Sequence, residues 1–389
     1  PSGVRPITQR LHDVGYITAN IKTIGDREVG TGKLDLNFVN EGELYQTDRW
    51  EDLKSSKPFF AQINMPEAEY DIYDRKSYEK PRVKWVGEEW HPKVATPDNV
   101  TPPPYYPDHP VTRAEWARYL NSVSGTDVRI GWILERLAAD GLDDDTVVVF
   151  FGDNGRLEAR GIHWPYDSGL HVPMVIRWPK NFTPPKQIRP GAASDELISL
   201  IDLTATTLWM AGIEIPLGMQ GRNFLGPDPA SPRRYVFSAR DRIDETEVRM
   251  RSVRGKRYHY IRNYYPDRHF TSLNRYTEKC FPIKPLMRRL MAEGKLSGPP
   301  ADLMSPTVPP EKLFDTVNDP HEIHNLADSK KAHHREALIR MRTALSVWMT
   351  ETQDQGVFPE PEEVVKPFGK EMHDWFGTPD WYSTSEKER

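Results

Sequence analysis

TVVVFFGDNGR, residues 146–156, is the stretch that decides the fold class of this 389-residue chain. Its first six residues are all β-branched or aromatic, a composition typical of a strand buried on both faces. A carboxylate and an amide, Asp153 and Asn154, follow almost at once. In an open α/β sheet, ligands collect beyond the carboxyl ends of the strands, so this stretch predicts both a buried strand and a site at its end.

Further strands and helices alternate on either side of this stretch. Three short apolar runs are typical of strands: YITANI (16–21), KPFFAQINM (57–65) and MVIRW (174–178). A long helix from Arg113 to Gly141 is indicated by four apolar residues at helical spacing, Ile130, Ile133, Leu134 and Leu137. Apolar strands joined by helices predict an α/β fold with a large, mostly parallel central sheet flanked by helices.

Beyond Gly226 the pattern changes to short runs of alternating apolar and polar residues, which are typical of antiparallel strands. These runs are RRYVFSARD (233–241), VRMRSVRGKRYHYIRN (248–263) and EKLFDTVNDP (311–320). A terminal helix around 333–352 is indicated by Leu338, Met341, Leu345 and Trp348. We therefore expect a main α/β domain over 1–226. A smaller C-terminal domain over 227–389 would hold an antiparallel sheet, the terminal helix and an extended tail.

Composition narrows the classes of partner. No apolar run approaches the length that spans a membrane, and PSGVRPITQRL (1–11) lacks the basic and apolar regions of a signal peptide. The net charge is -5 with both signs mixed along the chain, which argues against nucleic acid as the main partner. Cys280 is the one cysteine, so an internal disulfide is excluded. The sequence does not indicate an oligomeric state.

Asp153 and Asn154 form the first candidate site. They place two hard oxygen donors on adjacent residues, and the flanking glycines let the backbone turn sharply. Such donors favour Ca²⁺, or Mg²⁺ as the alternative, over zinc. The same Asp-Asn-Gly run is also a common turn without any ligand. From these residues alone, both interpretations stay open.

The longer run FFGDNGRLEARGIHWPYDSGLHVPMVIRWP (150–179) closely resembles a stretch of the sulfatase family, in the alkaline phosphatase superfamily. In that family a strand delivers D-[NH]-G, and a loop then leads to a pattern that YDSGLHVPMVIRWP matches. Further stretches resemble the family in the same order: HDVGYITAN (12–20), GTGKLDLNF (30–38), residues 195–225 and EKLFDTVNDPHEIHNLA (311–327). SARDRIDE (238–245) is similar to bacterial sulfatases of the heparan N-sulfatase-like branch.

The resemblance implies a calcium-dependent hydrolase of sulfate esters whose nucleophile is a formylglycine made from the cysteine of C-x-P-S-R. It implies that Asp153 and Asn154 bind the calcium and that Lys33 contacts the sulfate. The substrate would be a sulfated oligosaccharide or a related small ester. Members of the family are commonly exported, so this resemblance implies a periplasmic, extracellular or lysosome-like location.

The loop after the metal pair supplies further candidates. Arg156 and Arg160 would hold an anionic substrate, although solvated loop arginines are the alternative. His163 would act as a donor or general acid, or would be a loop histidine without such a role. His171 would orient the loop or meet the substrate. Arg240 and Arg242, which flank Asp241, would form an internal ion-pair network or approach the site.

Two motifs of the family are not in the sequence. The paired aspartates of its first strand and C-x-P-S-R would both precede Pro1, so we expect a complementary N-terminal segment to supply them. Cys280 lies in CFPIK, where Ile283 and Lys284 replace the serine and arginine of that motif. We therefore interpret Cys280 as a structural, half-buried residue.

Two further stretches also differ from the family. Ile162 stands where relatives usually have a lysine that grips sulfate. Glu67 and Glu69 stand near an expected histidine, and carboxylates there would repel a sulfate unless they bind a second cation or a substrate hydroxyl. These differences keep two rival functions open. One is a phosphate or phosphonate ester hydrolase of the same superfamily, and the other is a degenerate protein that binds sulfated glycans without turnover.

Overall fold

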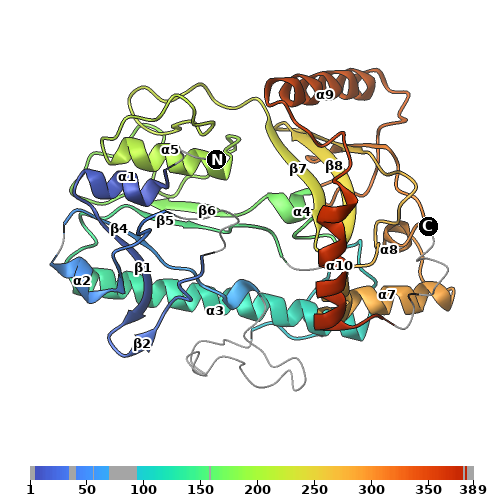
Figure 1. Ribbon diagram of the computed structural model, residues 1–389, viewed down its shortest axis with the longest axis horizontal. Coiled ribbons are helices and arrows are strands. Elements are labelled where there is room, and N and C mark those ends of the chain that lie inside the picture. The colour runs from blue at the N-terminus through green and yellow to red at the C-terminus, as the bar shows by residue number, and fades with distance from the viewer. Residues whose placement is uncertain are drawn as a thin grey trace. The chain divides into compact units, whose positions relative to one another are not determined.

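The computed structural model describes residues 5–34, 41–55, 57–69, 94–156, 159–379 and 382. The chain divides into two compact units (Figure 1). The first comprises Pro1–Val94, Tyr119–Phe151 and Pro173–Pro232, and the second comprises Ala95–Arg118, Gly152–Val172 and Arg233–Arg389. The domain boundary predicted after Gly226 lies close to the last of these junctions. Two segments that precede this junction, residues 95–118 and 152–172, also belong to the second unit. They do so because they contact the C-terminal part of the chain, although they are distant from it in the sequence.

The first unit contains a four-stranded sheet in which β1 (Ile17–Ile24) pairs with three other strands. These are β2 (Arg27–Glu28), β3 (Thr47–Arg49) and β4 (Phe59–Gln62). The pairs of β1 with β3 and β4 are parallel, and its pair with β2 is antiparallel. Two of the predicted strands are thus present and lie side by side in the predicted orientation. The unit also contains α1 (Ile7–Asp13), α2 (Glu51–Lys54), the short 3₁₀ helix η1 (Glu67–Glu69) and α5 (Leu200–Met210).

The other two predicted strands form a separate two-stranded sheet. They are β5 (Val148–Phe151) and β6 (Met174–Arg177), and they pair antiparallel. The large parallel sheet expected from the sequence is therefore only partly present among the described residues. Continuous apolar runs are typical of parallel strands buried on both faces, but the antiparallel pair of β5 and β6 shows the same pattern. Even the burial is incomplete here, since Phe151 and Val175 are 41% and 59% exposed.

The long helix α3 (Pro110–Ala139) contains most of the predicted helix and begins three residues earlier than expected. Gly141 follows it with a φ of +66°, a left-handed conformation that glycine adopts without strain. Near its end, Leu137 packs into a buried apolar cluster with Ile21 and Ile24 of β1. Burial of each such side chain contributes on the order of 1.5–3 kcal/mol.

The second unit contains the predicted antiparallel sheet, in the order β10-β9-β8-β7. Its strands are β7 (Val236–Ile243), β8 (Thr246–Arg254), β9 (Tyr258–Asn263) and β10 (Glu311–Asp315). The predicted terminal helix is α9 (Ala332–Glu351), and Figure 1 shows it beside this sheet. Its apolar stripe packs on Val253, Tyr260 and Leu313 through Leu338, Met341 and Leu345. The sequence prediction of a C-terminal antiparallel sheet with a helix is confirmed.

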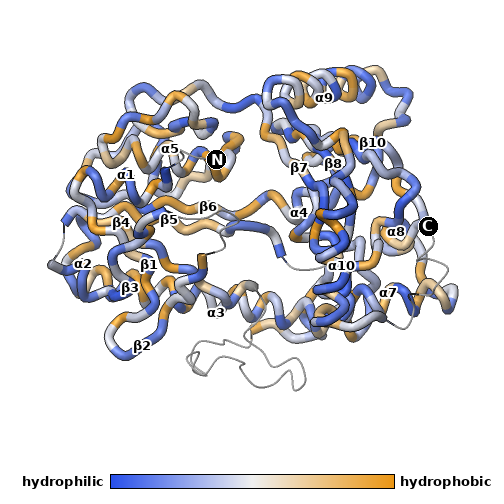
Figure 2. Tube along the Cα trace, in the orientation of Figure 1, coloured by the Kyte–Doolittle hydropathy of each residue, from blue (hydrophilic) through white to orange (hydrophobic). Residues whose placement is uncertain are grey.

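The described residues of the second unit also form α4 (Asp167–Leu170), α6 (Arg275–Cys280), α7 (Ile283–Ala292), α8 (Pro299–Leu303) and α10 (Glu362–Phe376). Figure 2 shows hydrophilic and hydrophobic residues interspersed along α3 and α9, the two longest helices. Within the described part of the chain, no helix combines the length and the apolar character needed to cross a membrane.

Candidate active site

Asp153 and Asn154 lie in the turn that leaves β5. Asp153 is exposed and Asn154 is half-buried. The Asn154 side-chain nitrogen donates a hydrogen bond to the Gly155 carbonyl at 2.8 Å. This bond directs the amide nitrogen toward the backbone, so the side-chain oxygen is the atom that can face an ion. A carboxylate and an amide oxygen are the donors that a hard cation prefers, and the pair fits Ca²⁺ chemically.

Close backbone packing holds this turn. The Gly155 amide donates to the Gly169 carbonyl at 2.9 Å. A Cβ atom added at Gly155 would lie only 2.0 Å from the Ser168 carbonyl oxygen, so a larger residue would displace the loop. The glycine after the candidate metal pair is thus required by this close approach rather than by a positive φ.

Arg156 is anchored in a cluster of aromatic residues from the same unit. Its Nη2 donates to the Tyr105 hydroxyl at 2.5 Å and to the Tyr106 hydroxyl at 3.1 Å. The guanidinium carbon lies 4.3 Å from the centre of the Trp116 ring, a cation–π distance. These contacts fix the position of the half-buried Arg156 side chain. Its contact with a substrate stays a prediction.

Arg160 is 3% exposed and its guanidinium is used inside the protein. It donates to the His321 carbonyl at 2.8 Å and to the Glu322 carbonyl at 2.9 Å. Its guanidinium carbon also lies within cation–π distance of two rings, 4.5 Å from the centre of Tyr105 and 4.0 Å from the centre of Tyr166. These contacts tie the loop to the segment after β10. The prediction that Arg160 contacts a substrate stays untested. Its internal hydrogen bonds and ring contacts do not favour that role.

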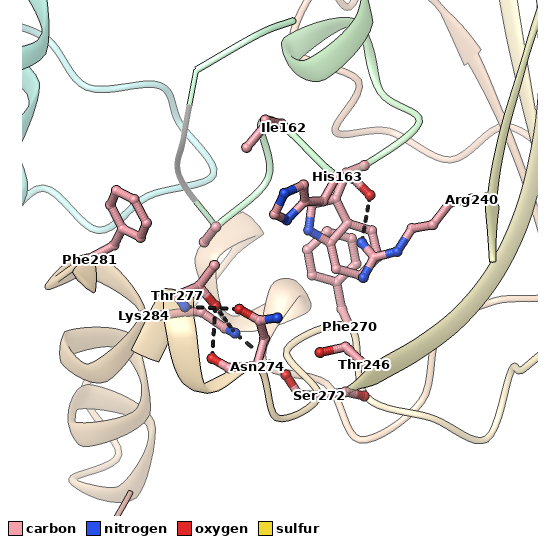
Figure 3. Close-up of a pocket in the computed structure, with 12 residues that line it drawn as sticks. Ile162, His163, Arg240, Thr246, Phe270, Ser272, Asn274, Thr277, Phe281 and Lys284 are labelled. Carbon is pink, nitrogen blue, oxygen red and sulfur yellow. Dashed lines mark hydrogen bonds between the residues drawn. The ribbon is translucent and has the colours of Figure 1, made fainter. Parts of the chain in front are cut away.

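His163 lies on the wall of a cavity of about 30 Å³ (Figure 3). Its φ of 78° lies in the left-handed region, which is uncommon for residues other than glycine, although asparagine, aspartate and histidine adopt it more often than the rest. Burial lowers the pKa of His163 to about 4, and the charge of Arg240 adds to the shift. The imidazole is therefore neutral at pH 7 and can either donate or accept one hydrogen bond at each ring nitrogen, according to its tautomer.

Two basic residues that were not predicted as site residues share this cavity. Arg240 comes from β7 and Lys284 from α7, and both line the cavity with Ile162 and His163. From the sequence, Arg240 is expected in an internal ion-pair network or near the site. Lys284 is distinguished in the sequence only as a mismatch in CFPIK. The SARDRIDE stretch is the one signal in the sequence for Arg240. For Lys284 there is no such signal, because nothing in the neighbouring residues indicates that this lysine reaches the cavity.

The neighbours of Arg240 do form the expected internal ion pairs. Arg242 pairs with Glu360 at 2.9 Å, and Asp241 pairs with Arg251 at 2.9 Å. The run 240–242 therefore combines two structural ion pairs with one arginine that faces the cavity.

Lys33 and His171 are exposed in the structure. The Lys33 carbonyl accepts a hydrogen bond from the Asn64 side chain at 3.0 Å, which ties the segment after β2 to the end of β4. His171 caps α4, and its amide donates to the Asp167 carbonyl at 2.8 Å. Lys33 belongs to the first unit and Asp153 to the second. The proximity of Lys33 to the metal pair therefore stays a prediction.

Glu67 is fully buried and forms an ion pair with Arg129 of α3. The expectation that Glu67 repels a sulfate is therefore wrong, because its charge is compensated inside the first unit. The sequence alone could not show this pairing, since 62 positions separate the two residues. The side chain of Glu69 lies outside the described residues.

Asp167, His259 and Glu322 gather in the second unit with their possible ligand atoms within 4.8 Å of one another. Two arginines compensate the carboxylates, since Arg254 contacts Asp167 at 3.0 Å and Arg160 contacts Glu322 at 3.5 Å. Burial opposes ionisation of Asp167, but His259 and Arg254 lower its pKa overall. We interpret this cluster as an ion-pair network that joins α4 to the antiparallel sheet.

Comparison with known proteins agrees with the sequence resemblance. Residues 40–213 match the Sulfatase family, and residues 159–276 match the family described as N-sulphoglucosamine sulphohydrolase, C-terminal. The chain is 31% identical to an ulvan-active sulfatase of Formosa agariphila, over 94% of this chain and 63% of that protein. It is 28% identical to the N-sulphoglucosamine sulphohydrolase of Homo sapiens, over 73% of this chain and 58% of that protein.

A solved structure shares the fold. The structure of a 2-O GAG sulfatase superposes with a TM-score of 0.53 at 17% identity, covering 91% of this chain and 76% of that one. The fold is thus an α/β fold of the alkaline-phosphatase-like class. Within that class the chain is similar to the sulfatase family, as the sequence predicted, and to its heparan N-sulfatase-like branch. It spans about three fifths of the length of the curated relatives that it matches.

Proposed function

We propose that this chain forms the metal-binding and substrate-binding part of a sulfatase that removes sulfate from a sulfated carbohydrate. The observation that carries the proposal is the turn after β5, where Asp153 and Asn154 offer two hard oxygen donors in a chain similar to the sulfatase family. The carbohydrate class is supported by the relatives, which are named for ulvan and for N-sulphoglucosamine. An exported location remains part of this proposal.

In the proposed site, Asp153 and Asn154 hold the calcium ion. A bound Ca²⁺ would spread the negative charge of the sulfate ester, which makes its sulfur a better electrophile. Formylglycine remains an expectation of the resemblance, since none of the 389 residues lies in a C-x-P-S-R motif. Lys33 would contact the sulfate oxygens by its charge.

The side chains after the turn would bind and orient the substrate. His163 is neutral at pH 7, so it can donate one hydrogen bond to the ester oxygen from the ring nitrogen that carries the proton. Arg156 is held by its aromatic neighbours, and His171 is exposed at the end of α4, so both would act at the substrate side of the site.

The test is the effect of Asp153→Ala on calcium binding and on hydrolysis of an aryl sulfate by the full-length gene product. We expect both to be lost, because the carboxylate supplies the charged ligand of the pair. Asp144→Ala, which removes an exposed carboxylate just before β5, is the matched control and should leave both unchanged. Full activity of Asp153→Ala would refute the assignment.

The two rival functions give different results in the same preparations. Stoichiometric zinc in the purified protein would favour the phosphate or phosphonate ester hydrolase, since that chemistry uses zinc held by histidines. Binding of a sulfated oligosaccharide without turnover by the full-length gene product would favour the non-catalytic glycan binder.

A further inference from the structure

We propose that the cavity at His163, Arg240 and Lys284 binds a second anionic group of the substrate sugar, a carboxylate or a sulfate other than the one that is cleaved. This inference rests on the proposed function for the identity of the substrate. The anion site itself is argued from the cavity alone, and every residue that lines it belongs to the second unit.

The first observation is an arginine whose hydrogen-bonding capacity is only partly used. Arg240 is 8% exposed, and its Nη1 donates to the His163 carbonyl at 2.6 Å. Its Nε is buried and has no hydrogen-bond partner among the described residues. A buried donor without a partner costs about 1–3 kcal/mol, and more when it is charged. An oxyanion that accepted from Nε and the neighbouring Nη2 in a fork would remove this cost.

The second observation is an excess of positive charge. None of the described residues that line the cavity is acidic, whereas Arg240 and Lys284 are both cationic. Lys284 pairs with Glu278 at 3.2 Å, but the same carboxylate also pairs with Arg288 at 2.9 Å. One carboxylate therefore serves two cations. Asp244 attracts Arg240, but its carboxylate accepts a hydrogen bond from Asn274 at 3.0 Å instead.

The ionisation of both cations agrees with this imbalance. Burial lowers the pKa of Arg240 to about 9, against the attraction of Asp244. Burial also lowers the pKa of Lys284 to about 8, against the attraction of Glu278. A desolvated cation whose partners do not restore its pKa is stabilised by any anion that enters.

The third observation is the size and the wall of the cavity. A cavity of about 30 Å³ has room for roughly two water molecules, which is the space of the two oxygens of a carboxylate rather than of a sugar ring. Trp164 stacks on Phe270 with ring centres 3.8 Å apart, and the Arg240 guanidinium carbon lies 3.9 Å from the centre of the Trp164 ring. This stack fixes the guanidinium plane before a ligand arrives.

The opposite wall adds neutral hydrogen-bonding groups. The Lys284 ammonium donates to the Thr277 hydroxyl at 3.0 Å, and Asn274 and Ser272 also line the cavity. Figure 3 shows Thr277 and Asn274 beside Lys284, on the side away from Arg240. Cations therefore approach the cavity from two directions, as a site for a small anion requires.

The experiment is calorimetric titration of the 389-residue chain with sodium glucuronate, with sodium sulfate and with neutral glucose. The buffer contains a chelator and no added calcium. We expect one or both anions to bind and glucose not to bind. Which anion binds identifies the carboxylate or the sulfate as the group recognised. Arg240→Gln should weaken binding at least about tenfold, since it removes the fork. The matched control Arg289→Gln, which removes an exposed arginine from α7, should bind like the native chain.

Lys284→Gln provides a second variant in case Arg240→Gln does not fold, which thermal unfolding would show. Lys284→Gln should also weaken anion binding at least about tenfold, because it removes the second cation of the cavity. The variant should still fold, because Glu278 keeps Arg288 as its partner. Unchanged binding by the folded variants, or no binding of either anion by the native chain, would overturn the inference. Asp153→Ala separates the two proposals, because it should lose calcium binding while it keeps the anion at Arg240.

Discussion

The carboxylate of Glu67 pairs with the guanidinium of Arg129 in the interior of the first unit, where the two side chains are 1% and 2% exposed. Arg129 also donates to the Val29 carbonyl at 2.6 Å. Burial raises the pKa of Glu67 and lowers the pKa of Arg129, and the attraction between the two opposes both shifts. The pair connects η1 to the middle of α3, so its role is structural.

Removal of one member of this pair should be costly. Glu67→Ala leaves the Arg129 charge buried without its partner, which typically costs about 3–5 kcal/mol of unfolding free energy. Urea unfolding of the native chain and the variant measures the difference. Asp48→Ala, which breaks the exposed pair with Lys22, is the control and should change the free energy little. Equal effects of the two substitutions would show that the Glu67 pair is not buried in solution.

A second prediction concerns the close packing of the turn after β5. Gly155→Ala would place a Cβ 2.0 Å from the Ser168 carbonyl oxygen, so the loop must move. We expect a loss of more than about 1 kcal/mol of unfolding free energy together with weaker calcium binding. Gly131→Ala is the control, because nothing lies within 4 Å of the added Cβ inside α3. That substitution should stabilise the chain by about 0.5–1 kcal/mol.

The two glycines therefore give opposite signs for the same chemical change. Thermal unfolding measures the stability, and calorimetry with Ca²⁺ measures the affinity. If Gly155→Ala bound calcium as tightly as the native chain, the metal pair would not depend on the packing of this turn.

The sequence predicted the positions of helices and strands better than it predicted which strands pair and in which direction. Apolar runs located β1, β4, β5 and β6, and helical spacing located α3 and α9, because burial imposes a period on the residues themselves. The antiparallel pairing of β5 with β6 was not predicted, since their continuous apolar runs are typical of parallel strands but require only burial on both faces.

The candidate site was predicted only where it is local in the sequence. Asp153 and Asn154 follow their strand directly, so position along the chain was enough. Arg240 and Lys284 reach His163 from 77 and 121 positions further along the chain. No periodicity links such residues, and only the packing of β7 and α7 brings them to one cavity.

The neutral state of His163 gives a prediction about pH. Its pKa in the folded chain is about 4, below the ordinary value of 6.5, so the unfolded chain binds the extra proton between these values. The stability that depends on His163 is therefore complete above pH 6.5 and is lost as the pH falls toward 4. His163→Asn suits the φ of 78° and removes this titration.

Unfolding free energies of both proteins between pH 4 and 7 test this prediction. The native chain should lose up to about 3 kcal/mol more than the variant across this window. Parallel curves for the two proteins would show that His163 is protonated as readily as in the unfolded chain.

Arg160 offers a direct comparison between a structural and a substrate-binding role. Its guanidinium pairs with Glu322, whose side chain is 1% exposed, so Arg160→Met leaves that carboxylate buried and less compensated. We expect a loss of about 3–5 kcal/mol of unfolding free energy, measured in urea. Arg177→Met, which removes an arginine from a more exposed pair with Asp143, should have a small effect.

If Arg160→Met were as stable as the native chain but raised KM for a sulfated substrate in the full-length gene product, Arg160 would bind the substrate. Its contacts with His321 and Glu322 would then be incidental. A stability loss with KM unchanged at a temperature where the variant is folded would assign Arg160 to the framework that positions the loop.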